Sequence, residues 1–247
     1  MTGKRIDDSL MEQELVNLYT ELFNDWARIW CDHNSIQVDT DERWGDFLTN
    51  PYLLSPSEAY KVASFRGMIC GQETYSYGKE LGEDNAMFCQ EFASVDKLMQ
   101  FYKEKMNTDH QSTTIWPFSK VIEKGTGIEF IYNNIAKIGL CGRQGFVPNM
   151  QPHILRKELE ITSPSFLVFL IGNQQRYIHE LDANDIVVYG SRPLYSNQDK
   201  VYVEEWDTNL GIPVLWAFHP RHLNWKSVNK DVQAIIIDWI NGLIKKG

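Results

Sequence analysis

Cysteines are few in this sequence, and they are widely separated. The four, Cys31, Cys70, Cys89 and Cys141, form no C-x-x-C pair, and the six histidines show no H-E-x-x-H spacing. A zinc or iron–sulfur site built from these residues is therefore not expected. Free thiols are typical of a reducing cytoplasm, so we predict a cytoplasmic protein with no cofactor and no metal.

Long apolar runs and glycine-rich phosphate loops are also missing. No apolar run approaches the roughly 20 residues that cross a bilayer. The charged, amphipathic N-terminus does not resemble a secretory signal, so we expect no membrane partner. The sequence contains no G-x-x-x-x-G-K-[ST], G-x-G-x-x-G or G-x-S-x-G motif. These absences weigh against nucleoside-triphosphate, dinucleotide and α/β-hydrolase chemistry.

Positive charge is in deficit. The chain has 24 lysines and arginines against 33 acidic residues, a net charge of −9, and a pI near 5.2. This balance argues against a general polyanion binder. Any nucleic-acid site must be a local basic patch, and a positive rim would support DNA as the partner. The candidates for such a rim are Arg66, Lys79, Lys137, Arg143, Arg221 and Lys226.

Apolar strand-like runs alternate with helical patterns along all 247 residues. This alternation predicts an α/β fold, with three α/β/α layers and a mainly parallel four-stranded central sheet. The expected central strands are 68–70, 128–137, 165–171 and 213–218, with peripheral strands at 186–189 and 201–206. The expected helices are 9–30, 94–106, 115–123, 149–159, 174–181 and 227–243. Ser9 and Ser227 are the expected caps of the first and the last helix, and residues 219–225 are expected to form a loop. We predict one domain, 1–247, in which residues 1–64 form a helical extension packed on the rest.

Each central strand ends in glycine or in a polar group. The four ends are Gly71-Gln72-Glu73, Asn133-Asn134, Gly172-Asn173 and His219-Pro220. Parallel strands present their carboxyl ends at one edge of a sheet, where ligands bind in open α/β folds. We therefore expect a carboxylate, amides, a histidine and aromatic rings around one crevice. Such a set suits recognition of a planar polar group and stabilisation of charge beside it.

Taken in order, these strand ends resemble the uracil-DNA glycosylase superfamily. Residues 71–76 are similar to its Gly-Gln-Asp-Pro-Tyr-His motif at Gly, Gln and Tyr, and 134–137 resemble Asn-Leu-Val-Lys. The apolar strand ending at Gly172 matches the third family strand, and 219–223 match His-Pro-Ser-Pro-Leu at His, Pro and Leu. The resemblance spans residues 66–225, without a counterpart for 1–64 and 182–212. The departures are Thr74, Ser76, Arg221 and His222.

The resemblance implies a base-excision N-glycosidase that hydrolyses the bond between a flipped, uracil-like base and deoxyribose in DNA. Glu73 would activate water and stabilise the sugar cation, and His219 would hydrogen-bond the leaving base as negative charge develops. Asn134 would read the edge of the base. No metal or cofactor is implied.

Other residues would shape the pocket and hold the DNA. Gln72, Tyr75 and Phe88 would bind the base, with Phe92 a rival to Phe88 as the stacking ring. Arg221 would contact phosphate. Leu223 would enter the duplex where the base has left.

Structural roles compete with each of these assignments: a turn carboxylate for Glu73, a strand cap for Asn134, a turn histidine for His219, and core packing for the aromatic rings. Two functional alternatives also stay open. One is a catalytically silent nucleobase- or nucleic-acid-binding protein that keeps the glycosylase fold. The other is a hydrolase acting on small nucleosides.

Overall fold

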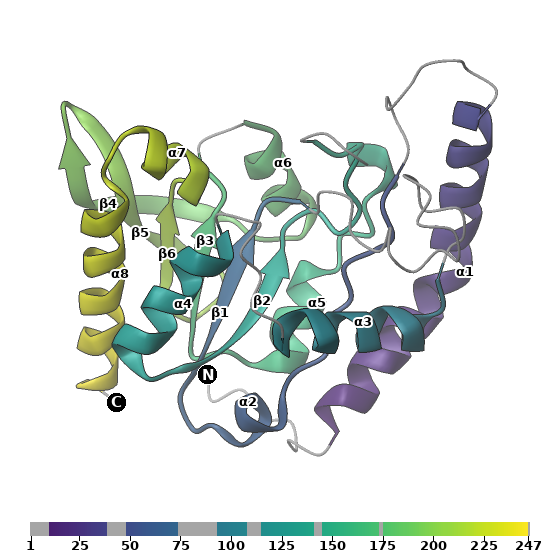
Figure 1. Ribbon diagram of the computed structural model, residues 1–247, viewed down its shortest axis with the longest axis horizontal. Helices are drawn as coiled ribbons and strands as arrows, with labels where there is room; N and C mark the ends of the chain where they lie inside the picture. The colour runs from purple at the N-terminus through teal and green to yellow at the C-terminus, as the bar shows by residue number, and fades with distance from the viewer. Residues whose placement is uncertain are drawn as a thin grey trace. The chain divides into compact units, whose positions relative to one another are not determined.

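The computed structural model describes residues 10–38, 48–73, 93–107, 115–140, 145–172 and 175–246. These residues form an α/β structure with a six-stranded sheet in the order β2-β1-β3-β6-β5-β4 (Figure 1). The α/β class is confirmed. The expected four-stranded, mainly parallel sheet is wrong in detail, because two antiparallel strands extend it into a mixed sheet.

The chain divides into two compact units whose segments alternate along the sequence. Unit 1 comprises Met1–Pro56, Glu73–Thr108 and Asn134–Thr162, and unit 2 comprises Ser57–Gln72, Asp109–Asn133 and Ser163–Gly247. Residues 1–64, expected to act as one extension, are therefore split between the two.

Unit 2 contains the sheet, apart from the last residue of β2. β1 (Arg66–Gly71) pairs in parallel with β3 (Phe166–Leu170), which pairs in parallel with β6 (Val214–Ala217). β2 (Glu129–Asn134) lies beside β1. On the other side, β5 (Lys200–Thr208) is antiparallel to β6, and β4 (Val188–Asn197) is antiparallel to β5. The predicted central position of the 165–171 strand is confirmed.

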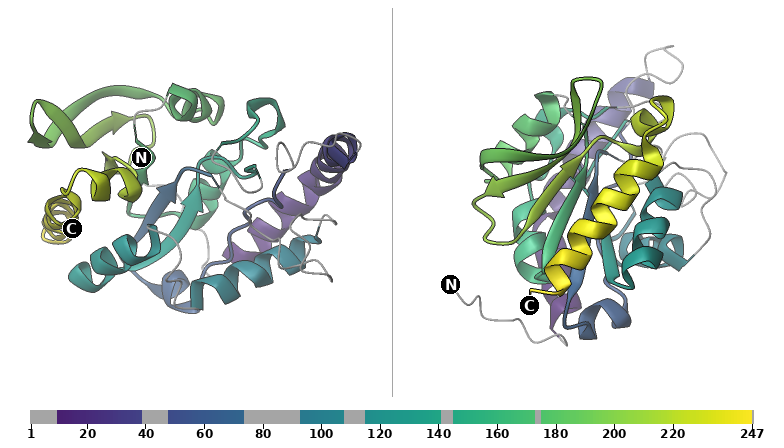
Figure 2. Two further views of the ribbon diagram at one scale, coloured as in Figure 1. Left: turned by 45° about the horizontal axis from the view of Figure 1, so that its top comes forward. Right: turned by 90° about the vertical axis from the view of Figure 1, so that its left-hand side faces the viewer.

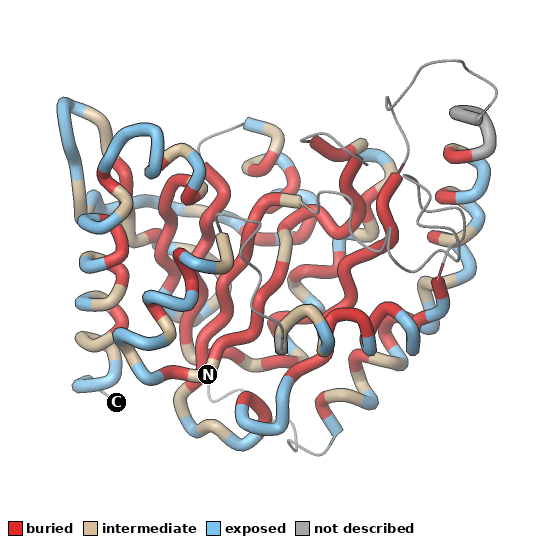
Figure 3. The backbone as a smooth tube through the Cα atoms, in the orientation of Figure 1, coloured by how far each residue is buried: buried red, intermediate tan, exposed pale blue. Residues whose placement is uncertain are grey.

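Apolar composition explains the inner strands, because every residue of β1, β3 and β6 is buried (Figure 3). The helices of unit 2 are α2 (Glu58–Val62), α4 (Ile115–Thr126), α6 (Gln175–Ala183), α7 (Pro220–Trp225) and α8 (Asn229–Ile244). Val232, Ile236 and Ile240 recur at i, i+4 spacing and form the buried stripe of α8. This helix lies along the sheet (Figure 2), where Trp239 packs edge-on against Phe166.

Two local predictions in unit 2 are wrong. Residues 219–225, expected as a loop, include the short helix α7, whose first residue is Pro220, a position where proline is favourable. Ser227 does not cap the closing helix, since α8 begins after Val228 without a side-chain cap. Ser227 instead has a positive φ of 55° in the turn between α7 and α8.

Unit 1 is helical. α1 (Met11–Val38) extends beyond the predicted 9–30, and it packs on α3 (Val95–Asn107) and α5 (Leu155–Thr162). The predicted helix at 149–159 starts too near the N-terminus. A 3-10 turn, η2 (Pro148–Met150), occupies the start of that range, and α5 begins only at Leu155. Trp30, Leu48, Ile138 and Leu140 form a buried cluster. Ser9, the expected cap of α1, lies outside the described residues.

Gly67 of β1 has a packing role that can be tested. A Cβ at this position would lie 2.5 Å from the ring of Phe166 and 2.6 Å from the ring of Phe130, which pack edge-to-face with centroids 5.7 Å apart. We expect Gly67→Ala to lower the free energy of unfolding by about 1–3 kcal/mol through overpacking, measured by urea denaturation. Gly242→Ala in α8 is the control, because nothing lies within 4 Å of its Cβ position. Equal stability of Gly67→Ala and wild type would contradict this role.

Candidate functional site

The carboxyl ends of β1, β3 and β6 converge at Gly172. A Cβ there would lie 4.0 Å from Gln72 Nε2 and 4.0 Å from the backbone nitrogen of His219. Gly172 has φ of +71°, the left-handed conformation that favours glycine. Gln72 Nε2 donates to the carbonyl of Ile171 at 2.7 Å, which links the ends of β1 and β3. For these three strands, the predicted convergence is confirmed.

The sheet topology makes this edge a suitable place for a ligand. From β1 the chain reaches β2 on one side and β3 on the other, so the strand order reverses between β1 and β3. Ligands of open α/β sheets bind at such switch points, outside the carboxyl ends of the strands. Trp216 Nε1 donates to the Gly172 carbonyl at 2.9 Å, which holds the turn after β3 against β6.

His219 is held as a neutral hydrogen-bond donor. It is the N-cap of α7, and its Nδ1 accepts the backbone N–H of Arg221 at 3.3 Å. This contact leaves the ring proton on Nε2. Burial, with a smaller contribution from the Arg221 charge, lowers the pKa of His219 from 6.5 to about 4. At neutral pH the uncharged ring therefore carries its proton on Nε2 and can donate it to a ligand.

The lowered pKa of His219 also predicts a pH dependence of stability. Between pH 6.5 and about 4 the unfolded chain binds a proton at this residue that the folded chain does not. Stability is therefore fully present above pH 6.5 and falls as the pH drops through this window. Urea midpoints at pH 7 and 4.5 should differ more in wild type than in His219→Asn. An equal difference would contradict the neutral, partly buried state of His219.

Glu73 and Asn134 belong to unit 1. Glu73 is partly buried, and its Oε1 accepts the backbone N–H of Gly145 at 2.8 Å. Asn134 is the last residue of β2 and is also partly buried. The Glu73 carboxylate thus accepts a backbone hydrogen bond, two residues beyond the end of β1, and Asn134 is itself the last residue of β2.

The remaining predicted site residues have different placements. Tyr75, Phe88 and the rival Phe92 lie outside the described residues. Arg221 is exposed on α7, as a phosphate-contacting residue must be. Leu223 is 0% exposed. Its assignment as the side chain that enters the duplex is therefore wrong, because the short α7 turns it into the core of unit 2.

The predicted basic rim is only partly present. Arg66 is buried and donates to the carbonyls of Tyr60, Lys61 and Ser163. Lys137 is buried in an ion pair with Glu158. Both cations therefore have structural roles and cannot belong to a surface rim. Arg221 and Lys226 are exposed, while Lys79 and Arg143 lie outside the described residues.

A cluster of aromatic rings and cations near His219 in the chain was not predicted from the sequence. His222 of α7 stacks on Phe218 with centroids 4.6 Å apart, and Lys200 Nζ lies 4.2 Å from the Phe218 centroid. Lys200 Nζ is also 3.1 Å from His222 Nε2. Burial, then the Lys200 and Lys226 charges, lower the pKa of His222, so the neutral ring accepts from Lys200. Lys200 is 22 residues away in sequence, and no local pattern could join the two.

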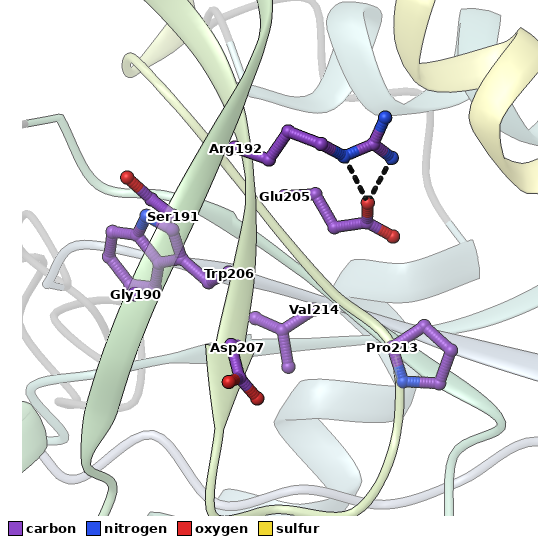
Figure 4. Close-up of a pocket in the computed structure, with 8 residues that line it drawn as sticks. All are labelled: Gly190, Ser191, Arg192, Glu205, Trp206, Asp207, Pro213 and Val214. Atoms are coloured by element: carbon purple, nitrogen blue, oxygen red, sulfur yellow. Dashed lines mark hydrogen bonds and ion pairs between the residues drawn. The ribbon is translucent and has the colours of Figure 1, made fainter.

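Described residues of unit 2 line at least two open hollows. The larger, about 480 Å³, contains the Arg192–Glu205 ion pair and is bordered by Pro213 and Val214 at the start of β6 (Figure 4). It is thus at the opposite end of β6 from His219. The smaller, about 400 Å³, is lined by Lys200 and by the rings of Trp216 and Phe218 near the end of β6. The chemistry at Gly172 therefore lies nearer the smaller hollow.

No family model and no curated protein matches this sequence. The function is therefore inferred from the chemistry of the strand ends. Among the described residues, no helix has the length and apolarity to cross a bilayer. That same part of the chain contains no group of three or more histidine, cysteine or acidic side chains placed to hold a metal ion.

Proposed function

We propose that this protein is a DNA base-excision N-glycosidase of the uracil-DNA glycosylase type. The observation that carries the proposal is the convergence at Gly172 of the Gln72 side-chain amide and the backbone of His219. The His219 ring is neutral at pH 7 and has its proton on Nε2. A neutral donor and an amide that follow the ends of neighbouring strands suit a flat heterocycle that leaves as an anion. β2, β1, β3 and β6 would form the glycosylase-like part of the sheet, to which β5 and β4 are added.

The reaction would break the bond between C1′ of deoxyribose and the base nitrogen, with both electrons leaving on the base. His219 Nε2–H would donate to the base carbonyl on which negative charge develops. The Glu73 carboxylate would stabilise the positive charge on the sugar and accept a proton as water adds to C1′. The products are an abasic deoxyribose and the base anion, which takes up a proton from solvent to give the free base. Asn134 would donate to and accept from the base edge, with Tyr75 and Phe88 packed against its faces.

The decisive experiment measures release of free base from oligonucleotides containing uracil, hypoxanthine or xanthine. Glu73→Gln is the sharpest variant, because glutamine keeps an oxygen that can accept the Gly145 N–H while the negative charge is lost. We expect base release by wild type and a rate about 100-fold or more lower for Glu73→Gln, in line with loss of a general base. No release from any of the three substrates by wild type would overturn the enzymatic proposal.

A second candidate is a catalytically silent protein that binds a nucleobase or nucleic acid with the same fold. It is favoured by the net charge of −9, which disfavours DNA binding. It is also favoured by the hydrogen bond that Glu73 accepts from Gly145, because this contact gives the carboxylate a structural role. This candidate predicts base binding without turnover, weakened by Asn134→Ala in calorimetry. Turnover of free nucleosides but not of oligonucleotides would instead identify a nucleoside hydrolase.

A further inference from the structure

Trp225, the last residue of α7, is more exposed than is usual for a tryptophan. It is 74% exposed, whereas every other tryptophan in the described part of the chain is buried or partly buried. A large aromatic ring left in water forgoes the burial energy that tryptophan normally contributes to a core. One exposed apolar residue needs no explanation by itself. The residues near Trp225 must therefore show whether a ligand binds this ring.

The segment that carries Trp225 is positively charged, against the trend of the whole chain. Residues 219–230 contain Arg221, Lys226 and Lys230 and no acidic residue, in a chain of net charge −9. All three cations are exposed. Asp231, which follows them, accepts the hydroxyl of Tyr195 at 2.8 Å. An exposed aromatic ring among exposed cations is complementary to a strand of bases and phosphates.

The helix holds the backbone of Trp225 in a defined position. Buried Pro220 and Leu223 anchor α7, which packs against α8. After Trp225, the Ser227 N–H donates to the Asn224 carbonyl at 3.1 Å, and the Val228 N–H donates to the Leu223 carbonyl at 3.2 Å. Trp225 follows His219 by six residues, which is about 9 Å along a helix axis. That distance corresponds to about two or three nucleotide steps along a strand at roughly 3.4 Å each.

We propose that Trp225 stacks on a base of the DNA strand two or three nucleotides from the base held at His219, with Arg221 and Lys226 on the intervening phosphates. This inference rests on the proposed function. It assigns the apolar contact with DNA to Trp225 in place of Leu223. It also explains how an acidic protein can bind a polyanion through one short, locally basic helix.

The test measures the affinity for a fluorescent single-stranded oligonucleotide that carries a non-hydrolysable deoxyuridine analogue. Trp225→Ala should weaken binding by about 5- to 150-fold, the range expected for loss of one base–aromatic stack. Trp225→Phe should restore most of the affinity. Lys226→Ala should reduce the slope of log K against log salt concentration by about 0.7. Tyr189→Ala is the matched control, since Tyr189 is 67% exposed on β4, outside the basic segment.

The outcomes separate this inference from the proposed function. Base release by wild type, together with Trp225→Ala affinity within twofold of wild type, would overturn the role of Trp225 and leave the glycosidase intact. Trp225-dependent binding without base release would overturn the glycosidase and leave the stacking role intact. An equal loss of affinity in Tyr189→Ala and Trp225→Ala, or no rescue by phenylalanine, would also overturn the inference.

Discussion

Replacing Lys137 with alanine is expected to lower the free energy of unfolding by about 3–5 kcal/mol. The Lys137 and Glu158 side chains are 2% and 0% exposed and form an ion pair. Glu158 also accepts the hydroxyl of Tyr19 at 2.7 Å, and that hydroxyl accepts the Leu54 N–H at 3.0 Å. Burial and the Glu158 charge raise the pKa of Tyr19 well above its usual value, so it remains a donor. Without Lys137, the buried Glu158 carboxylate loses its ion-pair partner.

The natural control is a second ion pair of unit 1, near the surface. Lys103 Nζ lies 2.6 Å from Glu12 Oε1, and these side chains are 40% and 33% exposed. Lys103→Ala should cost about 0–1 kcal/mol, because water replaces the lost partner. The double variant Lys137→Met with Glu158→Leu should recover part of the stability lost in Lys137→Ala. Urea denaturation of the four proteins checks this, and equal losses in Lys137→Ala and Lys103→Ala would contradict the buried-pair account.

The second large effect is expected in catalysis. His219→Asn should lower kcat for base release by about 100- to 1,000-fold, as found when one donor to a developing anion is removed. Asparagine is among the best N-cap residues, so its side chain can still accept the Arg221 N–H and begin α7. The variant therefore removes the Nε2–H donor and leaves the helix in place, which separates catalysis from folding.

The pH profile distinguishes a donor from a structural histidine at position 219. Because its pKa is lowered to about 4, the neutral donor form of His219 persists from pH 8 down to about 5. Wild-type kcat should show no titration of this residue over that range and should change only near pH 4. His179→Asn, at an exposed histidine of α6, is the matched control and should leave kcat unchanged. A kcat for His219→Asn within threefold of wild type would exclude the donor role.

The apolar strands and most helices could be predicted because their signals are local. The run at 165–171 has no polar residue between Ser165 and Gly172, and it became the fully buried β3 between two parallel partners. The stripe of Val232, Ile236 and Ile240 likewise predicted α8. In each case a short stretch buries enough apolar surface to specify its own secondary structure.

The antiparallel half of the sheet was underestimated because its signal is not hydrophobic. β4 runs over Val188–Asn197, most of it exposed, where the pattern predicted only 186–189. Its length comes from pairing with β5 across a turn at Gln198 and Asp199, which both have positive φ. Backbone hydrogen bonds to a neighbouring strand, and not apolar alternation, hold these residues.

The sequence by itself determined the α/β class, the inner strands and the polar residues that end them, because neighbours in the chain carry that information. Tertiary structure alone decided which charged and aromatic side chains are exposed and able to contact a ligand. It buried Lys137 against Glu158, buried Leu223 and left Trp225 in water, and it lowered the pKa of His219. The physical reason is that the free energy of a charge or a ring depends on what surrounds it, and those surroundings come from residues far away in sequence.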